Sequence, residues 1–371
     1  MKILKHPFIT NAAHILALFN LAVAQPLYEL ISGDADFLVV RDTTYAELIS
    51  AVFVLSFLLP AVLLLFESAA GWISRHLQKI IHLFLIGTLL GLILLRAFNL
   101  SLALSGIAIV TLAAVAAAIF AYCYHSFAII RTFLTWLGAL VVIVPALFLL
   151  NSDVAKAVAA PPPITLKKNN VSIPVVLMIF DELPLTSLLN AEGDIDASRY
   201  PNFAKFRADA TWFRNASSVS GETARAVTAI LTGMYPEKKR LTRLQDYPDN
   251  LFTLLGGTHE MKVIEPMTKL RPLSSLIKRQ SFSEKLLSML SDLSAIYLNL
   301  VVPEDLSGWL PRVDNQWSDF WASQKRSSKY ARFYVRLEQF RVFVDSIKPS
   351  DKPTLYFMHS MMPHAPWLVL A

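Results

Sequence analysis

The distribution of apolar residues divides the chain near residue 150. The first 150 of the 371 residues are predominantly apolar, whereas the later residues mix apolar and polar stretches as soluble domains do. An α-helix needs roughly 20 apolar residues to cross a bilayer. Five runs of about that length lie near 9–31, 48–66, 80–95, 102–122 and 133–150. Because apolar runs recur after the first, we interpret it as a retained span and not a signal peptide. We expect a five-helix α-helical transmembrane domain over 1–150.

Cationic residues in the short loops predict the orientation of this domain. With a cytoplasmic N-terminus, the inner loops carry Lys2, Lys5, Arg75, Lys79 and Arg131, and the outer loops carry Arg41 and Arg96. This excess on the inside favours that orientation. An odd number of spans then places the rest of the chain outside. We interpret 151–170, which contains three consecutive prolines, as an extended extracytoplasmic linker.

Two polar residues interrupt the first apolar run. His14 and Asn20 would lie inside the membrane. Hydrogen bonding between helices is the more frequent use of such residues, and a functional polar site is the alternative.

The second half of the chain predicts alternating strands and helices. The apolar, β-branched run at 172–180 is typical of a strand buried on both faces. Further strands are predicted over 211–216, 261–264 and 353–358, and helices over 201–207 and 251–256, with another helix that begins at Thr223. This alternation predicts an α/β domain with a mainly parallel sheet. Residues 273–348 are mixed and helical and indicate no chemistry.

Composition agrees with a membrane protein. Hydrophobic residues make up 54% of the chain and charged residues only 17%. The net charge of +6 is scattered in short clusters, so the sequence does not support nucleic-acid binding. The single cysteine, Cys123, excludes an intrachain disulfide.

Three segments of the second half carry candidate chemistry. Asp181 and Glu182 follow the first strand, where open α/β sheets place their sites, and their oxygens suit a divalent cation; solvated loop acids are the alternative. Thr223 lies at the start of an apolar helix, where unpaired N–H groups bind anions; a capping threonine is the alternative. His364, between two prolines, could face an anion or a metal, or only shape a turn.

Taken in order, these segments resemble the alkaline phosphatase superfamily in its sulfatase-like branch. The matches are the strand ending in Asp181-Glu182, the 200–207 helix leading to 213–215, the 223–236 segment, and the 363–366 motif. The resemblance covers about 171–371 and implies an α/β catalytic domain there. Five spans before an outward-facing catalytic domain are also similar to lipoteichoic-acid synthases and phosphoethanolamine transferases of bacterial envelopes.

The resemblance implies a role for each matched residue. It implies one or more divalent metal ions (zinc, manganese, magnesium or calcium), held by Asp181, Glu182 and Thr223. It implies substrate contacts from Arg225, His364 and Asn215, although Arg225 could instead form a salt bridge near the helix start. Thr223 takes the position of the nucleophile. Sulfatases of this family convert a Cys or Ser there to formylglycine, which threonine cannot form, so a metal-activated threonine that attacks phosphorus fits better.

The same resemblance implies ligands that this sequence lacks. The family completes its metal site with an Asp-His pair and a further histidine, downstream of the motif matched at 363–366. None of the eight histidines here follows an aspartate. We therefore expect a catalytic domain that is incomplete at its C-terminus.

The sequence thus predicts a membrane-anchored hydrolase or transferase acting on phospho-esters of envelope lipids or glycans. It would lie in the bacterial cytoplasmic (inner) membrane with its C-terminal domain outside. Its expected partners are the lipid bilayer and an anionic lipid or glycan ester. A sulfuric-ester hydrolase of the same family and a catalytically incomplete membrane protein with an interaction role are the alternatives.

Overall fold

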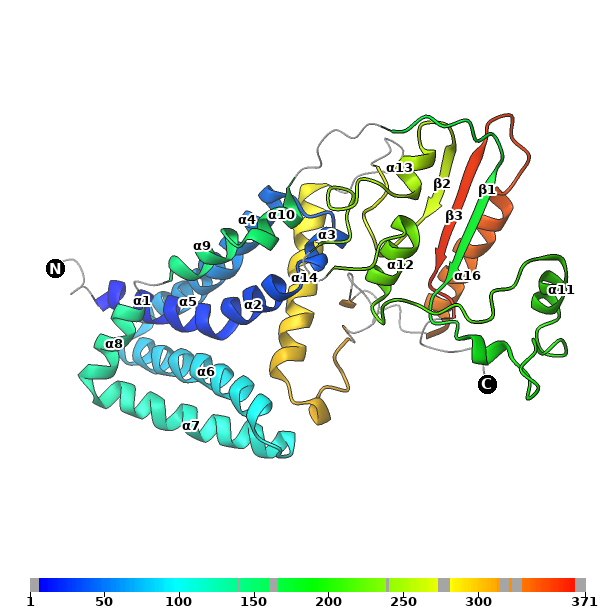
Figure 1. Cartoon of the computed structure of the whole chain (residues 1–371). Helices are drawn as coiled ribbons and strands as arrows, with labels where there is room; N and C mark the ends of the chain where they lie inside the picture. The colour runs from blue at the N-terminus through cyan, green and yellow to red at the C-terminus, as the bar shows by residue number, and fades with distance from the viewer. Residues whose placement is uncertain are drawn as a thin grey trace. The chain divides into compact units, whose positions relative to one another are not determined.

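The computed structural model describes residues 7–138, 141–159, 166–237, 240–272, 281–311, 313, 320–321 and 329–363. The chain forms two compact units, each built from two separate stretches of sequence (Figure 1). Unit 1 comprises Met1–Ala160 and Ile277–Lys325, and unit 2 comprises Pro161–Leu276 and Arg326–Ala371. The division is therefore not linear along the chain, in contrast to the predicted boundary near residue 150.

Among its described residues, unit 1 contains five helical segments that are long and apolar enough to cross a membrane. We call them spans 1 to 5: Phe8–Gly33, Tyr45–Ile73, Arg75–Ser101, Gly106–Ser126 and Ala128–Leu149. They confirm the five apolar runs predicted from the sequence. Span 3 is longer than predicted because Ser74 caps it, accepting a hydrogen bond from the Leu77 amide at 3.0 Å, and so adds a polar first turn.

The first two spans each contain a short π-helical segment. Span 1 consists of α1 (Pro7–Phe19), η2 (Asn20–Ala24) and α2 (Gln25–Gly33), and span 2 of α4 (Tyr45–Phe53), η3 (Val54–Leu58) and α5 (Leu59–Ile73). Spans 3 and 4 are the single helices α6 (Arg75–Ser101) and α7 (Gly106–Ser126). Span 5 is formed by α8 (Ala128–Gly138) and α9 (Ile143–Leu149), with 139–140 outside the described residues.

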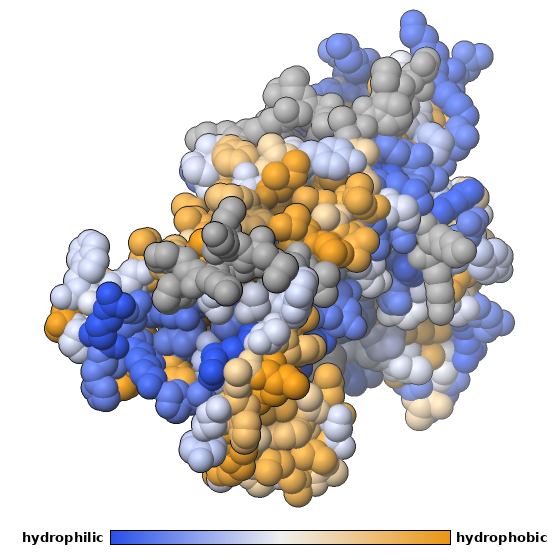
Figure 2. Space-filling view, turned by 90° about the vertical axis from the view of Figure 1, so that its left-hand side faces the viewer, coloured by the Kyte–Doolittle hydropathy of each residue, from blue (hydrophilic) through white to orange (hydrophobic). Residues whose placement is uncertain are grey.

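The outer surface of the spans is strongly apolar. Figure 2 shows large hydrophobic areas over this part of the molecule. Trp72 is 91% exposed and Trp136 is 71% exposed, and Phe66, Phe84 and Ile107 are each 69% exposed. A protein surrounded by water rarely leaves apolar patches of such extent uncovered. The surface suits contact with lipid.

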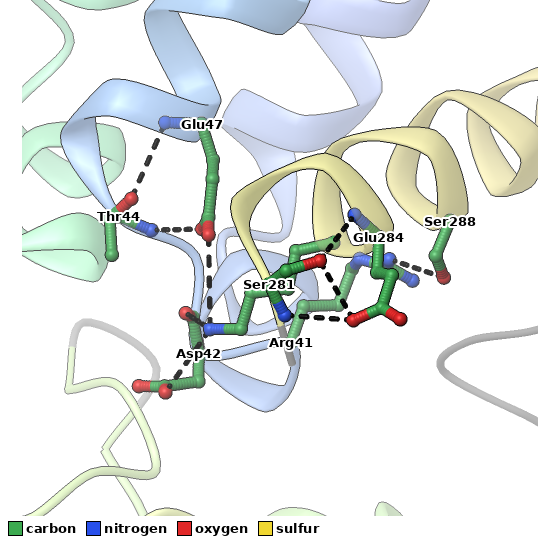
Figure 3. A network of polar contacts seen from close by, with 8 residues as sticks. Arg41, Asp42, Thr44, Glu47, Ser281, Glu284 and Ser288 are labelled. Atoms are coloured by element: carbon green, nitrogen blue, oxygen red, sulfur yellow. Dashed lines mark hydrogen bonds and ion pairs between the residues drawn. The ribbon is translucent and has the colours of Figure 1, made fainter. Parts of the chain in front are cut away.

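A helix from the second half of the chain belongs to unit 1. Helix α14 (Phe282–Val301) packs beside α4 and the loop that follows span 1, as Figure 3 shows. Arg41 of that loop pairs with Asp292, and both side chains are buried. Lys285 Nζ lies 3.4 Å from Asp42 Oδ2 and 3.9 Å from Glu47 Oε1. These ion pairs explain why 277–325 belong to unit 1 and not to the predicted 171–371 domain.

A second contact joins the same stretch to the start of span 4. After α14, the short helix η5 (Glu304–Leu306) presents Asp305, whose Oδ2 accepts a hydrogen bond from the Gly106 amide at 2.8 Å. The stretch therefore contacts the beginning of span 4 as well as the loop between spans 1 and 2.

The segment predicted as an extended linker is partly helical. Asn151 caps α10 (Ser152–Val158), accepting hydrogen bonds from the amides of Asp153 and Val154. Val154 and Val158 of this helix are buried in unit 1, near α3 (Asp36–Val40). Residues 166–170 already belong to unit 2, where the Lys167 amide donates to the Thr253 carbonyl at 3.2 Å. The proline-rich stretch between them lies outside the described residues.

Unit 2 contains a parallel sheet of three described strands. The strands β1 (Val175–Phe180), β2 (Glu260–Ile264) and β3 (Thr354–Ser360) lie in the order β1-β3-β2, so β3 is central. Helices α12 (Thr223–Thr232) and α13 (Leu251–Leu255) cover one face, and α16 (Lys329–Ser346) covers the other (Figure 1). The α/β architecture and these three strands agree with the sequence prediction.

Side-chain alternation along β3 builds a core on each face. Leu355 and Phe357 pack with the apolar residues of α12 and α13, whereas Tyr356 and Met358 pack against Phe343 of α16. All four of these strand residues are buried. The central strand is therefore fixed in register between two apolar layers.

One predicted strand is wrong. Residues 211–216 form a loop with a turn after α11 (Pro201–Asp209), and Phe213 is 76% exposed. The segment has strand-like composition, but a strand also needs a neighbour for its backbone groups. Trp212 instead lies against the Arg207 guanidinium, whose carbon is 4.3 Å from the ring centre.

Candidate functional site

The carboxyl ends of the three strands bring titratable side chains to one edge of the sheet. Asp181 follows β1, Glu265 follows β2, and His359 is the penultimate residue of β3. The residues two positions earlier are Ile179, Val263 and Phe357, respectively. All three pack in the core on the face of the sheet that α12 covers. Because side chains alternate with a period of two, all three positions fall on the α12 face.

Thr223 meets this edge from α12. It is the first residue of the helix, and its Oγ1 donates a hydrogen bond to Asp181 Oδ1 at 3.3 Å. The N-cap residue is Glu222, whose side chain makes no capping hydrogen bond. Thr223 is therefore not a helix cap, which was the alternative interpretation of its sequence position. The N-cap side chain thus leaves the first amides of α12 open, the arrangement that favours anion binding.

The backbone changes direction sharply beside Asp181. The Asp181 amide donates to the Ser360 carbonyl at 3.0 Å, which extends the β1–β3 pairing by one residue. Asp181 is buried, and the next residue, Glu182, is exposed and has a φ of 54°. A left-handed conformation at a residue other than glycine is uncommon and costs about 1 kcal/mol or more. The fold therefore holds a strained turn directly after the carboxylate that contacts Thr223.

Arg225 is held at the start of the same helix. Its Nε pairs with the Glu222 carboxylate, and its Nη1 donates to the Glu237 carbonyl at 3.0 Å. A helix turns by about 100° per residue, so Arg225 lies about 200° around the axis from Thr223. This is the salt bridge near the helix start that the sequence left open as the alternative to a substrate contact.

The other two predicted substrate contacts are not brought to Thr223 by a described interaction. Asn215 lies in the exposed turn after α11. His364 lies outside the described residues.

His359 and Glu265 form a buried pair beside this site. His359 Nδ1 lies 3.4 Å from Glu265 Oε1 and 3.2 Å from Oε2, and both side chains are almost fully buried. Oε1 also accepts hydrogen bonds from the amides of Met267 at 2.7 Å and Thr268 at 2.9 Å. His359 Nε2 is buried without a hydrogen-bond partner among the described residues.

Sequence reasoning missed Glu265. The signal was present, because Glu265 directly follows a predicted strand, as Asp181 does. The rule that sites lie at the carboxyl ends of parallel strands applies equally to both acids.

Comparisons with known proteins do not assign this site. No protein-family model, curated protein or solved structure matches the chain. The chemistry of the site is therefore argued from its own residues.

The Asp181–Thr223 pair fits two neighbouring ligands of a divalent cation. Oxygen ligands lie about 2.1 to 2.5 Å from Mg²⁺ or Ca²⁺, so adjacent ligands are roughly 3 to 3.5 Å apart. The observed 3.3 Å falls in this range. Among the described residues, no three His, Cys, Asp or Glu side chains group closely enough to hold a metal ion. Two oxygens at this spacing would be only part of the ligand set that a divalent cation needs.

Proposed function

We propose that this protein is a membrane-anchored hydrolase or transferase that acts on phospho-esters of lipids or glycans through Thr223. The observation that carries the proposal is the hydrogen bond from Thr223 Oγ1 to Asp181 Oδ1, at the carboxyl edge of a parallel sheet. It joins two residues 42 positions apart in the sequence. A resemblance to the sulfatase-like branch of the alkaline phosphatase superfamily agrees with this assignment.

The contacts of Thr223 support a role as nucleophile. A threonine hydroxyl is a weak nucleophile unless a neighbouring base or a metal ion activates it. Asp181 Oδ1 already accepts the hydroxyl hydrogen bond and is the atom that would receive the proton. The uncapped first turn of α12 presents N–H groups and the positive end of the helix dipole to a transferred phosphoryl group.

The proposed reaction has two steps. The Thr223 oxygen attacks phosphorus, its proton passes to Asp181, and the bond from phosphorus to the leaving alcohol breaks. The leaving alkoxide takes a proton from water and leaves a hydroxide ion. Water or an acceptor hydroxyl then attacks the phosphothreonine and gives up its proton to that hydroxide. The bond to Thr223 breaks, and the threonine oxygen takes back the proton held by Asp181. Asp181 and Thr223, with Glu182 next in the sequence, would hold a divalent cation. The cation would lower the pKa of the threonine hydroxyl and neutralise negative charge at the site.

The experiment that tests this proposal detects the covalent intermediate. The full chain in detergent micelles is incubated with a phosphodiester or a phosphoglycolipid and Mn²⁺ or Zn²⁺, and its intact mass is measured. We expect a phospho-adduct on the wild type and none on Thr223→Ala. Peptide mapping should place the adduct on the peptide that contains Thr223.

A matched variant guards against an indirect effect. Thr232→Ala changes the same residue type at the last position of α12, away from the sheet edge. It should form the adduct as the wild type does. An adduct that survives Thr223→Ala would reject the nucleophile. Its absence from the wild type under all metal conditions would favour the interaction role.

A further inference from the structure

Unit 1 contains a polar cavity of about 580 Å³ that the proposed function does not use. Three cations line it: Arg75 and Lys79 from span 3, and Arg131 from span 5. Asn11, Gln78 and Tyr124 add polar groups, and Phe8 and Leu83 add apolar wall. The described lining residues include no carboxylate.

The lining residues gather at one end of the spans. Phe8 and Asn11 lie at the start of span 1, Arg75 at the start of span 3, and Arg131 near the start of span 5. Tyr124 lies at the end of span 4. Odd-numbered spans begin, and even-numbered spans end, on the same side of a membrane. The cavity therefore lies at a single membrane face, and Figure 2 shows hydrophilic residues beside apolar areas on this part of the molecule.

The contribution of span 3 is one continuous helix face. Arg75, Gln78, Lys79, His82 and Leu83 follow the spacing i, i+3, i+4, i+7 and i+8. Residues with this spacing share one side of an α-helix. Two unit charges are therefore held one turn apart along the same wall, where they repel each other. Neither Arg75 nor Lys79 pairs with a carboxylate among the described residues.

A chain of hydrogen bonds links three residues that line the cavity, Asn11, His82 and Tyr124, through buried side chains. Glu67 accepts from Asn11 Nδ2 at 2.7 Å and lies 3.0 Å from His82 Nδ1. His82 Nε2 is 2.7 Å from the Tyr124 hydroxyl, which is also 2.8 Å from His14 Nδ1.

The chain ends on span 5 and so includes a residue from every span. His14 Nε2 lies 2.8 Å from Thr135 Oγ1. Satisfied polar networks of this kind fix a single arrangement of helices. Glu67, the carboxylate that Asn11 and His82 contact, is engaged within this network and is not among the described lining residues.

Arg131 is positioned by the backbone of span 4. Its Nη1 donates to the carbonyls of Tyr124 at 2.8 Å and His125 at 2.7 Å. These carbonyls belong to the last turn of α7, the negative end of its dipole. These bonds hold the guanidinium at the cavity, and its nitrogens other than Nη1 are donors for a ligand.

We propose that this cavity binds the phosphate group of an anionic ligand. Three cations without a carboxylate among the described lining residues attract an anion, and guanidinium and ammonium groups suit phosphate oxygens. Basic pockets between membrane helices are suited to anionic head groups. The phosphate can belong to a lipid head group, with the acyl chains along Phe8 and Leu83, or to a soluble phosphate compound. The site is independent of Thr223 and of the reaction proposed for unit 2.

Native mass spectrometry of the full chain in detergent tests this site. The protein is titrated separately with phosphatidylglycerol, with phosphatidylcholine of the same acyl chains, and with inorganic phosphate. We expect phosphatidylglycerol to bind at least about tenfold more tightly than phosphatidylcholine. Removing one cation should weaken binding about fivefold, so Arg75→Gln with Lys79→Gln should weaken it about 25-fold.

Two further variants separate charge at the cavity from net charge. The double variant Arg96→Gln with Lys156→Gln also removes two positive charges, but elsewhere in unit 1. Arg96 pairs with Glu29, and Lys156 pairs with Asp153. This pair should bind as the wild type does. Arg75→Lys should retain most of the binding, which also reports that span 3 is folded.

The arms of the titration distinguish the two sources of phosphate. Phosphatidylglycerol binding that excess inorganic phosphate does not displace identifies a lipid site. Inorganic phosphate binding that is lost in the Arg75 and Lys79 double variant identifies a soluble ligand. Equal binding of both lipids without phosphate binding, or equal losses in the two double variants, would overturn the proposal.

Discussion

At the scale of single residues, the Thr223–Asp181 contact makes a sharp prediction for Asp181. Asp181→Asn keeps a hydrogen-bond acceptor near the hydroxyl but removes the negative charge and the proton acceptor. We expect the rate of phospho-adduct formation to fall about 100-fold or more, the usual contribution of a positioned base. Quenched-flow sampling followed by intact-mass measurement gives this rate. Asp209→Asn, at the exposed end of α11, is the control and should leave the rate unchanged.

A second residue-scale prediction concerns the start of α14. The amide and hydroxyl of Ser281 each donate to Glu284 Oε2 at 2.8 Å, and these bonds lower the pKa of Glu284. A carboxylate with a lowered pKa stabilises the folded helix start above its unfolded pKa, and that stabilisation is lost as the pH falls through the folded pKa. Hydrogen exchange of the first α14 amides should therefore quicken below the ordinary pKa of 4.5, beyond the intrinsic effect of pH. Glu284→Gln should remove this additional pH dependence, and an unchanged profile in that variant would contradict the assignment.

At the scale of elements, the docking of α14 depends on the Arg41–Asp292 ion pair more than on the ion pairs of Lys285. Asp292 is fully buried, and it pairs with Arg41 and accepts the Phe320 amide at 2.9 Å. Arg41→Ala would leave that charge without its cation, which costs about 3 to 5 kcal/mol. Lys285→Ala removes pairs with the largely exposed Asp42 and with Glu47, and should cost about 1 kcal/mol or less.

Hydrogen exchange of α14 in the full chain measures both changes. Arg41→Ala should raise the exchange rate along the whole helix, and Lys285→Ala should leave it nearly unchanged. Similar rates in the two variants would show that apolar packing alone docks the helix.

Periodicity and element boundaries identified most of the fold, but not its long-range pairings. The five spans and the three strands were predictable because each is an apolar run of about the length that its element requires. The pairing of Arg41 with Asp292 was not, since the two residues are 251 positions apart and each is an ordinary charged residue in the sequence. The predicted strand at 211–216 failed for the related reason that composition does not show whether a neighbouring strand exists.

The candidate site was also predictable only in part. Asp181 and Thr223 were identified because one ends a strand and the other begins a helix, and those positions meet in a parallel sheet. Glu265 obeys the same rule but follows a strand of only five residues, so its significance depended on the sheet order β1-β3-β2. The strained conformation of Glu182 could not be predicted, since no residue type marks it.

At the scale of the whole molecule, the contacts within unit 1 constrain the membrane topology. Helix α14 contacts the loop between spans 1 and 2, and Asp305 contacts the first residue of span 4. With five alternating spans, both places lie on the membrane side at which span 5 ends. A stretch that follows span 5 can reach them without crossing the membrane again. The cationic cavity lies at the opposite ends of the spans, where the excess of cations predicts the cytoplasm.

Labelling of single cysteines tests this topology. Leu104 precedes span 4 and Phe127 precedes span 5, and both side chains are 53% exposed in short connections. In a Cys123→Ala background, we expect a membrane-impermeant maleimide to label Leu104→Cys in intact cells and Phe127→Cys only after permeabilisation. Because the two side chains are equally exposed, a difference in their labelling reports the side of the membrane and not burial. Labelling in the opposite sense would place unit 2 in the cytoplasm, and labelling of both sites in intact cells would contradict the alternation of five membrane spans.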